Sequence, residues 1–269
     1  MAIVALTAAR RSPGVSTAAL ALALNWPRRV LLIEADVSGS SSILAGHLRS
    51  SVPHERGLVD LAIAHQQGKL SQRLSSISLP LPIADELSRV RFIPGLTQAV
   101  QATSMPPVWP ELAAIATSLE NFGTDVIVDA GRLGTDSGPT ALLRRTDVVL
   151  VLTRTQLAAV AATRAAVPKL RDDVSKPEGG AASIFIVTVG SGMPYTDTEI
   201  RAALATPVLG TVAWDPTAAE VYSDGATPNR RHSRSALITS VRALAMAVDA
   251  HIAERRARIG VNGVADAWA

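Results

Sequence analysis

The chain has 269 residues, 48% of them hydrophobic and 18% charged, a composition that excludes a disordered chain and supports a packed globular core. It contains no cysteine, which excludes disulfides and thiolate metal sites. A formal net charge of only +3 is weak support for binding to nucleic acid or acidic membrane.

Two further features bear on the compartment and on metals. No apolar run in the sequence approaches the ~18 residues that a membrane span needs, and the apolar stretch at the N-terminus precedes its arginines, the reverse of a signal peptide. We therefore expect a cytoplasmic protein. The histidines show no metal-ligand spacing, and we expect no metal site at His47, His54, His65, His232 or His251.

Strand-like and helix-like segments alternate along the chain. The expected strands are 2–6, 29–35, 90–94, 125–129, 147–153, 183–189 and 207–212. The expected helices are 16–25, 40–48, 57–66, 108–121, 155–171, 196–204 and 232–258. The strands are almost continuously apolar, as in strands buried on both faces of a parallel sheet. The alternation predicts a doubly wound α/β fold with a mostly parallel sheet and helices on both faces.

The chain shows no long linker, so we expect one domain over residues 1–259. The irregular segments 71–89 and 172–181 are expected to be surface loops. Residues 260–269 are small and polar, and we expect a flexible tail there.

The first candidate site is the segment Arg-Ser-Pro-Gly-Val-Ser-Thr-Ala at 11–18, between an apolar strand and an Ala/Leu-rich helix. That setting is typical of a phosphate-binding P-loop, but Thr17 stands at the lysine position and Ala18 at the position of the Mg²⁺-binding hydroxyl. Backbone N–H groups at the helix N-terminus still favour an anion there; the alternative is an ordinary strand-to-helix loop. The residues expected to line this site are Arg11, Ser12, Pro13, Gly14, Val15, Ser16, Thr17 and Ala18.

Two more strands end in acidic residues. The strand at 29–35 is followed by Asp36, and the strand at 125–129 closes on Asp129, as in a Walker B motif. In parallel strands such carboxylates can face a nucleotide's Mg²⁺ or its attacking water. The alternative for Asp36 is a helix cap or a loop carboxylate.

This ordered set of motifs resembles the ParA/MinD family of deviant-Walker P-loop ATPases along roughly residues 1–250. The family's K-G-G-V-G-K-T-T stretch corresponds to residues 12–19, and its second-strand D-x-D to Glu34-Ala35-Asp36. Its "p-v-l-G-v-I-P-x-D" segment corresponds to 207–215, so the resemblance places Asp215 beside the nucleotide base. The resemblance implies a P-loop NTPase fold that binds ATP or ADP.

Three departures from the family pattern bear on activity. Ser12 replaces the signature lysine that reaches across the family's ATP-sandwich dimer, Thr17 replaces the Walker lysine, and Ala18 replaces the Mg²⁺-binding threonine. Losing one such cation costs on the order of 10³-fold in rate. We therefore expect weak nucleotide binding, negligible hydrolysis and no catalytic residue, with Arg10 or Arg11 as the alternative source of positive charge.

The segment from Asn229 to Arg258 is rich in arginine and carries apolar residues at helical spacing. Its arginines are Arg230, Arg231, Arg234, Arg242, Arg255, Arg256 and Arg258. We expect a last helix packed on the sheet, whose basic face is either merely solvated or contacts DNA or acidic lipid. The residues after Gly260 offer few large apolar side chains for a membrane-targeting tail.

From this resemblance we expect a spatial positioning or scaffolding protein. Divergent members of the family include TadZ/CpaE-like proteins, which localise pilus-assembly and secretion ATPases, and the missing lysines favour such a role with a secretion or pilus ATPase as partner. Any homodimer would not depend on ATP. The alternatives are a working ATPase for DNA partition or septum placement, and a DNA-binding module that uses the basic C-terminal helix. We expect the protein in the cytoplasm, with the inner membrane face as a place of attachment.

Overall fold

The computed structural model describes residues 2–10, 13–52, 56–83, 86–175 and 182–265. Its centre is an eight-stranded sheet in the order β3-β4-β2-β5-β1-β6-β7-β8. The strands are β1 (Ile3–Ala8), β2 (Arg29–Glu34), β3 (Leu79–Ile83), β4 (Glu86–Ile93), β5 (Thr124–Arg132), β6 (Val148–Arg154), β7 (Ser183–Val189) and β8 (Val208–Val212). Every neighbouring pair is parallel except β3 with β4.

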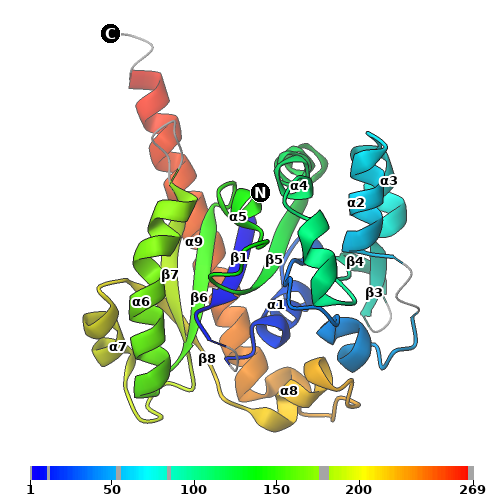
Figure 1. Ribbon diagram of the computed structural model, residues 1–269. Coiled ribbons are helices and arrows are strands. Elements are labelled where there is room, and N and C mark those ends of the chain that lie inside the picture. Colours follow the sequence, from blue (N-terminus) through cyan, green and yellow to red (C-terminus); the bar gives the residue numbers. More distant parts are fainter. Residues whose placement is uncertain (1, 11–12, 53–55, 84–85, 176–181, 266–269) are drawn as a thin grey trace.

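Helices cover both faces of the sheet (Figure 1). The α-helices are α1 (Val15–Leu24), α2 (Leu58–Gln66), α3 (Leu70–Ile77), α4 (Val108–Ser118), α5 (Thr140–Leu143), α6 (Leu157–Val174), α7 (Asp197–Leu204), α8 (Pro216–Ser223) and α9 (Ala236–Ala265). A π-helical turn, η1 (Ile43–His47), and three 3₁₀ turns, η2 (Ala99–Ser104), η3 (Leu119–Phe122) and η4 (His232–Arg234), complete the elements.

The two faces of the sheet have separate cores because successive strand residues point to opposite sides. Val126 and Val128 belong to the core beneath α2 to α7, whereas Ile127 belongs to the core beneath α1, α8 and α9. The continuous apolar strands are thus buried on both faces, which confirms the predicted doubly wound, mostly parallel α/β fold.

The segment 71–89 is not a surface loop, and that expectation was wrong. It contains most of α3, the antiparallel strand β3 and the start of β4. The sequence Leu-Pro-Leu-Pro at 79–82 looks like a turn, but proline is tolerated on an edge strand, where one side of the backbone has no ladder to join. Helix α3 buries Leu70, Leu74 and Ile77, a spacing of four and three that marks one helical face.

Further differences concern helices. The short elements η2, α5 and α8 were not predicted, because segments of four to eight residues carry little periodic signal. The last helix extends to Ala265, past the expected end at 258 and into the segment expected to be a tail. Of the expected loop at 172–181, residues up to Val174 continue α6, and 176–181 lie outside the described residues.

Within the part of the chain that the structure describes, one segment, Ala236–Arg258 of α9, is long and apolar enough to cross a membrane by length and composition. Its apolar stripe is packed on the sheet, with buried side chains at Leu237, Val241, Leu244, Val248 and Ile252. In this structure the segment is therefore a core helix of the domain.

Candidate functional site

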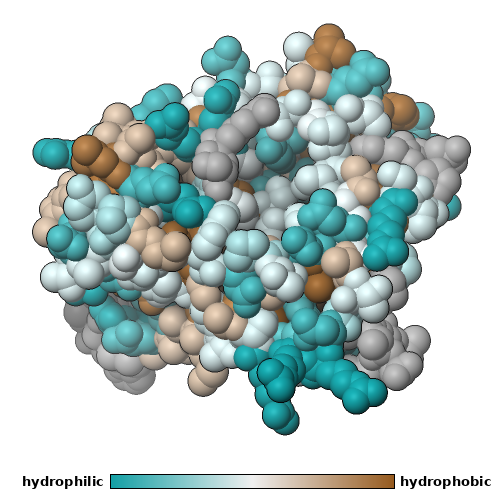
Figure 2. Space-filling model, turned by 90° about the horizontal axis from the view of Figure 1, so that it is seen from below, coloured by the Kyte–Doolittle hydropathy of each residue, from teal (hydrophilic) through white to brown (hydrophobic). Residues whose placement is uncertain are grey.

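A cavity of about 360 Å³ opens at the carboxyl ends of β1, β2 and β5, where the chain enters α1. Figure 2 views the molecule from this end, and its surface there is mixed, with hydrophilic side chains around small apolar spots. In an open α/β sheet this edge is the usual place for a ligand. Of the residues predicted for the phosphate loop, the cavity wall includes Pro13, Gly14, Val15, Ser16 and Thr17.

The start of α1 has the backbone geometry of an anion site. Gly14 precedes the helix with φ of 76°, a left-handed conformation that suits glycine, and its carbonyl accepts the N–H of Ala18 at 2.9 Å. The N–H groups of the first turn have no partner within the helix, and that turn carries no acidic residue. Arg11 and Ser12, also predicted to line the site, lie outside the described residues.

Ala18 and Asp215 lie in an adjoining cavity of about 180 Å³, which shares Pro13, Gly14 and Thr17 with the first. Asp215 caps α8, since its carboxylate accepts the N–H of Ala218 at 3.1 Å. Ala18 is buried in the core and carries no group that could bind a metal.

Asp129 lies beneath the first cavity and is fully buried. One carboxylate oxygen, Oδ1, accepts the N–H of Gly131 at 3.0 Å, while Oδ2 has no hydrogen-bond partner among the described residues. Burial, reinforced by the nearby Glu34, raises the pKa of Asp129 to about 7. The Ser16 hydroxyl lies close enough to favour the ionised form, without a well-formed hydrogen bond to Oδ2.

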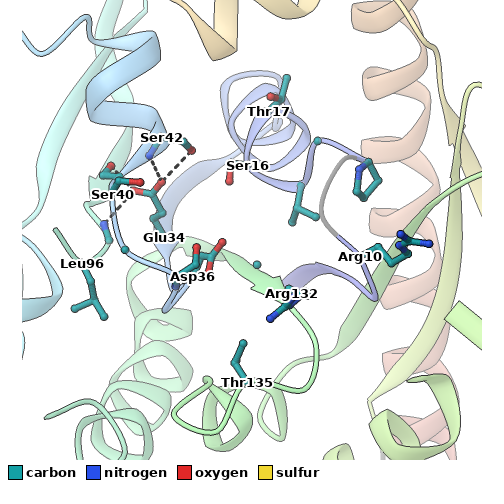
Figure 3. Close-up of a pocket in the computed structure, with 18 residues that line it drawn as sticks. Arg10, Ser16, Thr17, Glu34, Asp36, Ser40, Ser42, Leu96, Arg132 and Thr135 are labelled. Carbon is teal, nitrogen blue, oxygen red and sulfur yellow. Dashed lines mark hydrogen bonds between the residues drawn. The ribbon is translucent and has the colours of Figure 1, made fainter. Parts of the chain in front are cut away.

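Glu34 is a second buried carboxylate of the site, which the sequence analysis did not include among the site residues. It accepts hydrogen bonds from the Ser41 hydroxyl, from the Ser42 N–H at 3.0 Å and from the Gly95 N–H at 3.0 Å (Figure 3). Burial raises its pKa, against the effect of these donors. Glu34 therefore ties β2 to two loops that line the cavity, and the acidic residue at the end of an apolar strand was the available signal.

Asp36 lines the cavity next to the end of β5. Its Oδ1 accepts the N–H of Ser38 at 2.8 Å, which fits the loop-carboxylate alternative for this residue. Gly131 has φ of 58°, and a Cβ there would lie 2.3 Å from Asp36 Cγ. A glycine is thus required where the loops after β2 and β5 meet.

Two described arginines stand at the cavity. Arg10 is exposed, and its Nη1 lies 3.5 Å from the carbonyl of Ala158. Arg132, which was not predicted to line the site, is also exposed and lines the cavity (Figure 3). The available signal was its position on the Walker B strand, three residues after Asp129.

The residues present fit a phosphate group but not a Mg²⁺ ion. Free backbone N–H groups and two arginines can bind phosphate oxygens. The hydroxyl that would bind Mg²⁺ is replaced by the buried Ala18. Among the described residues, no group of three or more His, Asp or Glu side chains is arranged to hold a metal.

Comparison with known proteins identifies the fold. No family model and no curated protein matches the chain. The ParA family ATPase from Chlorobium tepidum TLS superposes with a TM-score of 0.70 at 17% identity, covering 91% of this chain and 98% of that one. The septum site-determining protein MinD from Pyrococcus horikoshii OT3, complexed with Mg-ADP, gives 0.67 at 16% identity, covering 92% and 96%. The chain has the ParA/MinD fold.

A third similar structure is the MinC:MinD cell division protein complex of Aquifex aeolicus, with a TM-score of 0.66 at 12% identity over 93% of this chain and 96% of that one. At these identities the likeness shows the ParA/MinD fold alone. It confirms the family resemblance in architecture and leaves the role of each loop residue to be tested.

The C-terminal arginines do not form one continuous basic face. Arg242 donates to Asn25 Oδ1 at 3.0 Å, Arg255 to the carbonyl of Asp147 at 2.9 Å, and Arg258 to Glu254 at 2.8 Å. Arg256 lies 3.7 Å from Asp147. Arg230, Arg231 and Arg234 before α9 are exposed, and so are Arg242 and Arg258 on α9 itself. Contact of this basic C-terminal segment with DNA or acidic lipid stays a prediction.

Proposed function

We propose that this chain is a positioning or scaffolding protein with the ParA/MinD fold, whose pocket binds nucleotide weakly and does not hydrolyse it, and which recruits a pilus-assembly or secretion ATPase. The observation that carries the proposal is the first turn of α1. Thr17 and Ala18 occupy the places of a lysine and a Mg²⁺-binding hydroxyl, and Ala18 is 5% exposed.

The charges around the pocket support this proposal. Stabilising a transferring phosphoryl group requires preorganised positive charge in a water-excluded place. Here the two described cations, Arg10 and Arg132, are exposed, while Glu34 and Asp129 are buried. The raised pKa of Asp129 indicates that no cation lies close enough to offset the burial of its carboxylate.

The similar structures supply a precedent for the scaffold role. One was solved with Mg-ADP and another in complex with a second protein, MinC. By analogy with that complex we propose a protein partner. We also propose a homodimer that forms without ATP, because Ser12 replaces the lysine that would cross an ATP-sandwich dimer, and a location in the cytoplasm at the inner membrane face. The particular partner, a secretion or pilus ATPase, rests on the resemblance to TadZ/CpaE-like proteins.

Nucleotide turnover and binding test the proposal. Purified protein should release no phosphate from ATP above the level of the Asp129→Ala variant, with or without Mg²⁺. Calorimetry should show weak ATP binding that Mg²⁺ does not strengthen. Robust Mg²⁺-dependent turnover that Asp129→Ala abolishes would support the alternative, a working ATPase that uses arginines in place of lysines.

Self-association and cellular position provide the second test. Light scattering at several protein concentrations should give the same oligomeric state with and without ATP. A fluorescent fusion should form discrete foci, and the Arg10→Ala/Arg132→Ala variant should form them too. A dimer that appears only with ATP, or uniformly diffuse fluorescence, would overturn the proposal.

A further inference from the structure

A second and larger hollow lies at the amino ends of β2, β4 and β5, at the end of the sheet opposite the nucleotide-type pocket. Its volume is about 600 Å³. We refer to it as the amino-end groove. Its floor is formed by β2 and β4, one wall by α3, and the other by α4 and η3.

The floor of the groove is basic because of the strand register. Leu31 pairs with Arg91, and Arg29 and Arg89 lie two residues before them on the same face. All three arginines are exposed and line the groove. None of the groove's lining residues, all of them described, is acidic.

The guanidinium groups are not equivalent. Arg91 is held at the end of α3, where its Nε donates to Ser78 Oγ at 2.7 Å and its Nη2 to the Ser75 carbonyl at 2.8 Å. It is therefore fixed in place at the groove wall. The guanidinium group of Arg29 makes no hydrogen bond or ion pair with any described residue, so its charge is available to a ligand.

The opposite wall is apolar. Ile115, Leu119 and Phe122 follow one another at helical spacing, and all three line the groove. Ile115 and Leu119 are half-buried, while Phe122 is 72% exposed. A large exposed aromatic side chain beside a hollow is a common feature of protein-binding surfaces.

We propose that the amino-end groove binds an acidic amphipathic helix of a partner protein. Its apolar residues would pack on Phe122, Leu119 and Ile115, and its carboxylates would pair with Arg29 and the neighbouring arginines. The existence of such a partner rests on the proposed recruiting function. Because the groove and the nucleotide-type pocket are at opposite ends of the strands, the partner would leave the pocket open.

The test is a selection with a displayed library of helical peptides against the whole chain. Enriched peptides should combine acidic residues with a stripe of large apolar residues. Their affinity, measured by fluorescence anisotropy on synthetic peptides, should fall roughly tenfold or more for Arg29→Glu and for Phe122→Ala. Matched controls are Arg164→Glu, an exposed arginine on α6, and Met246→Ala, a 74% exposed residue on α9, and neither should change the affinity.

Three results would overturn the proposal. The enriched peptides could lack acidic residues, they could bind the Arg29→Glu/Phe122→Ala protein as tightly as the wild type, or duplex DNA or anionic vesicles could bind this groove more tightly than any peptide. Thermal melts of each variant check that the exposed substitutions leave the fold intact. ATP turnover is measured separately. Hydrolysis would refute the proposed function without changing the peptide-binding result, and a failure of peptide binding would refute the groove proposal without changing the turnover result.

Discussion

Asp125 and Asp129 lie four residues apart on β5, both with 0% exposure, but their surroundings differ. Asp125 accepts hydrogen bonds from the Ala2 N–H at 2.6 Å, from Trp26 Nε1 at 2.6 Å and from Arg28 Nε at 2.7 Å. Asp129 accepts one, from the Gly131 N–H, and its Oδ2 has no partner among the described residues.

The difference follows from where α1 meets the strand. Asp125 faces the end of α1, where Trp26 and Arg28 of the following turn supply donors. Asp129 faces the start of α1, where Ser16 lies and where a P-loop would carry its lysine. A buried carboxylate whose oxygens all accept hydrogen bonds is structural, whereas a buried carboxylate with an unpaired oxygen beneath a cavity is a candidate functional residue.

The largest loss of stability is expected when Asp125, the carboxylate with three hydrogen-bond donors, is replaced. Asp125→Ala leaves three donors without their acceptor and should lower the free energy of unfolding by about 3–5 kcal/mol. Asp249→Ala is the control, because Asp249 also binds Arg28 but is 39% exposed, and it should cost less than about 1 kcal/mol. Urea denaturation measures both variants, and equal losses would contradict the distinction.

Replacing Asp129, the carboxylate with an unpaired oxygen, should have the opposite effect on the free energy of unfolding. The pKa of Asp129 is raised from 3.8 to about 7 in the folded protein, so its ionisation disfavours folding. The penalty is absent below about pH 4, grows between pH 4 and 7, and is complete above pH 7. Asp129→Asn should therefore leave stability unchanged near pH 4 and increase it by up to about 4 kcal/mol near pH 8. A variant less stable than the wild type at pH 8 would show that the ionised carboxylate is well stabilised after all.

The stability that the Trp26 hydrogen bond to Asp125 contributes can be measured by comparing two buried tryptophans. Trp26→Phe keeps an aromatic ring but removes the N–H that donates to the charged Asp125, and should cost about 2 kcal/mol. Trp109→Phe removes an N–H that donates to the neutral carbonyl of Ser137 at 3.0 Å, and should cost about 1 kcal/mol. Thermal or urea unfolding measures both variants. A greater loss of stability for Trp109→Phe than for Trp26→Phe would contradict a larger contribution from the bond to the charged acceptor.

The smallest expected effect is on the titration of Asp129. The Ser16 hydroxyl lowers the pKa of Asp129, so Ser16→Ala should raise that pKa by less than about one unit. Thr17→Ala, at the next position of the loop, should leave it unchanged. Carboxyl carbon chemical shifts recorded against pH give both values, and equal shifts for the two variants would remove Ser16 from the list of groups that act on Asp129.

Local sequence patterns were sufficient for the alternation of strands and helices, the doubly wound fold class and the position of the loop between β1 and α1. Each depends on neighbouring residues: near-continuous apolar runs mark β5 and β6, and a strand followed by a helix frames Gly14. For the same reason the proline-containing edge strand β3 was missed, because its local sequence resembles a turn. The helices α5 and α8 were missed because such short segments carry little periodic signal.

What only the tertiary structure decided is which distant residues share a site. Glu34 meets the Gly95 N–H across 61 residues, and Asp36 lies against Gly131, because the order of the strands places β2 beside both β4 and β5. Asp125 and Asp129 look alike in the sequence, an acidic residue at each end of an apolar run. Their difference arises from the donors that Ala2, Trp26 and Arg28 bring to one end, which no local pattern encodes.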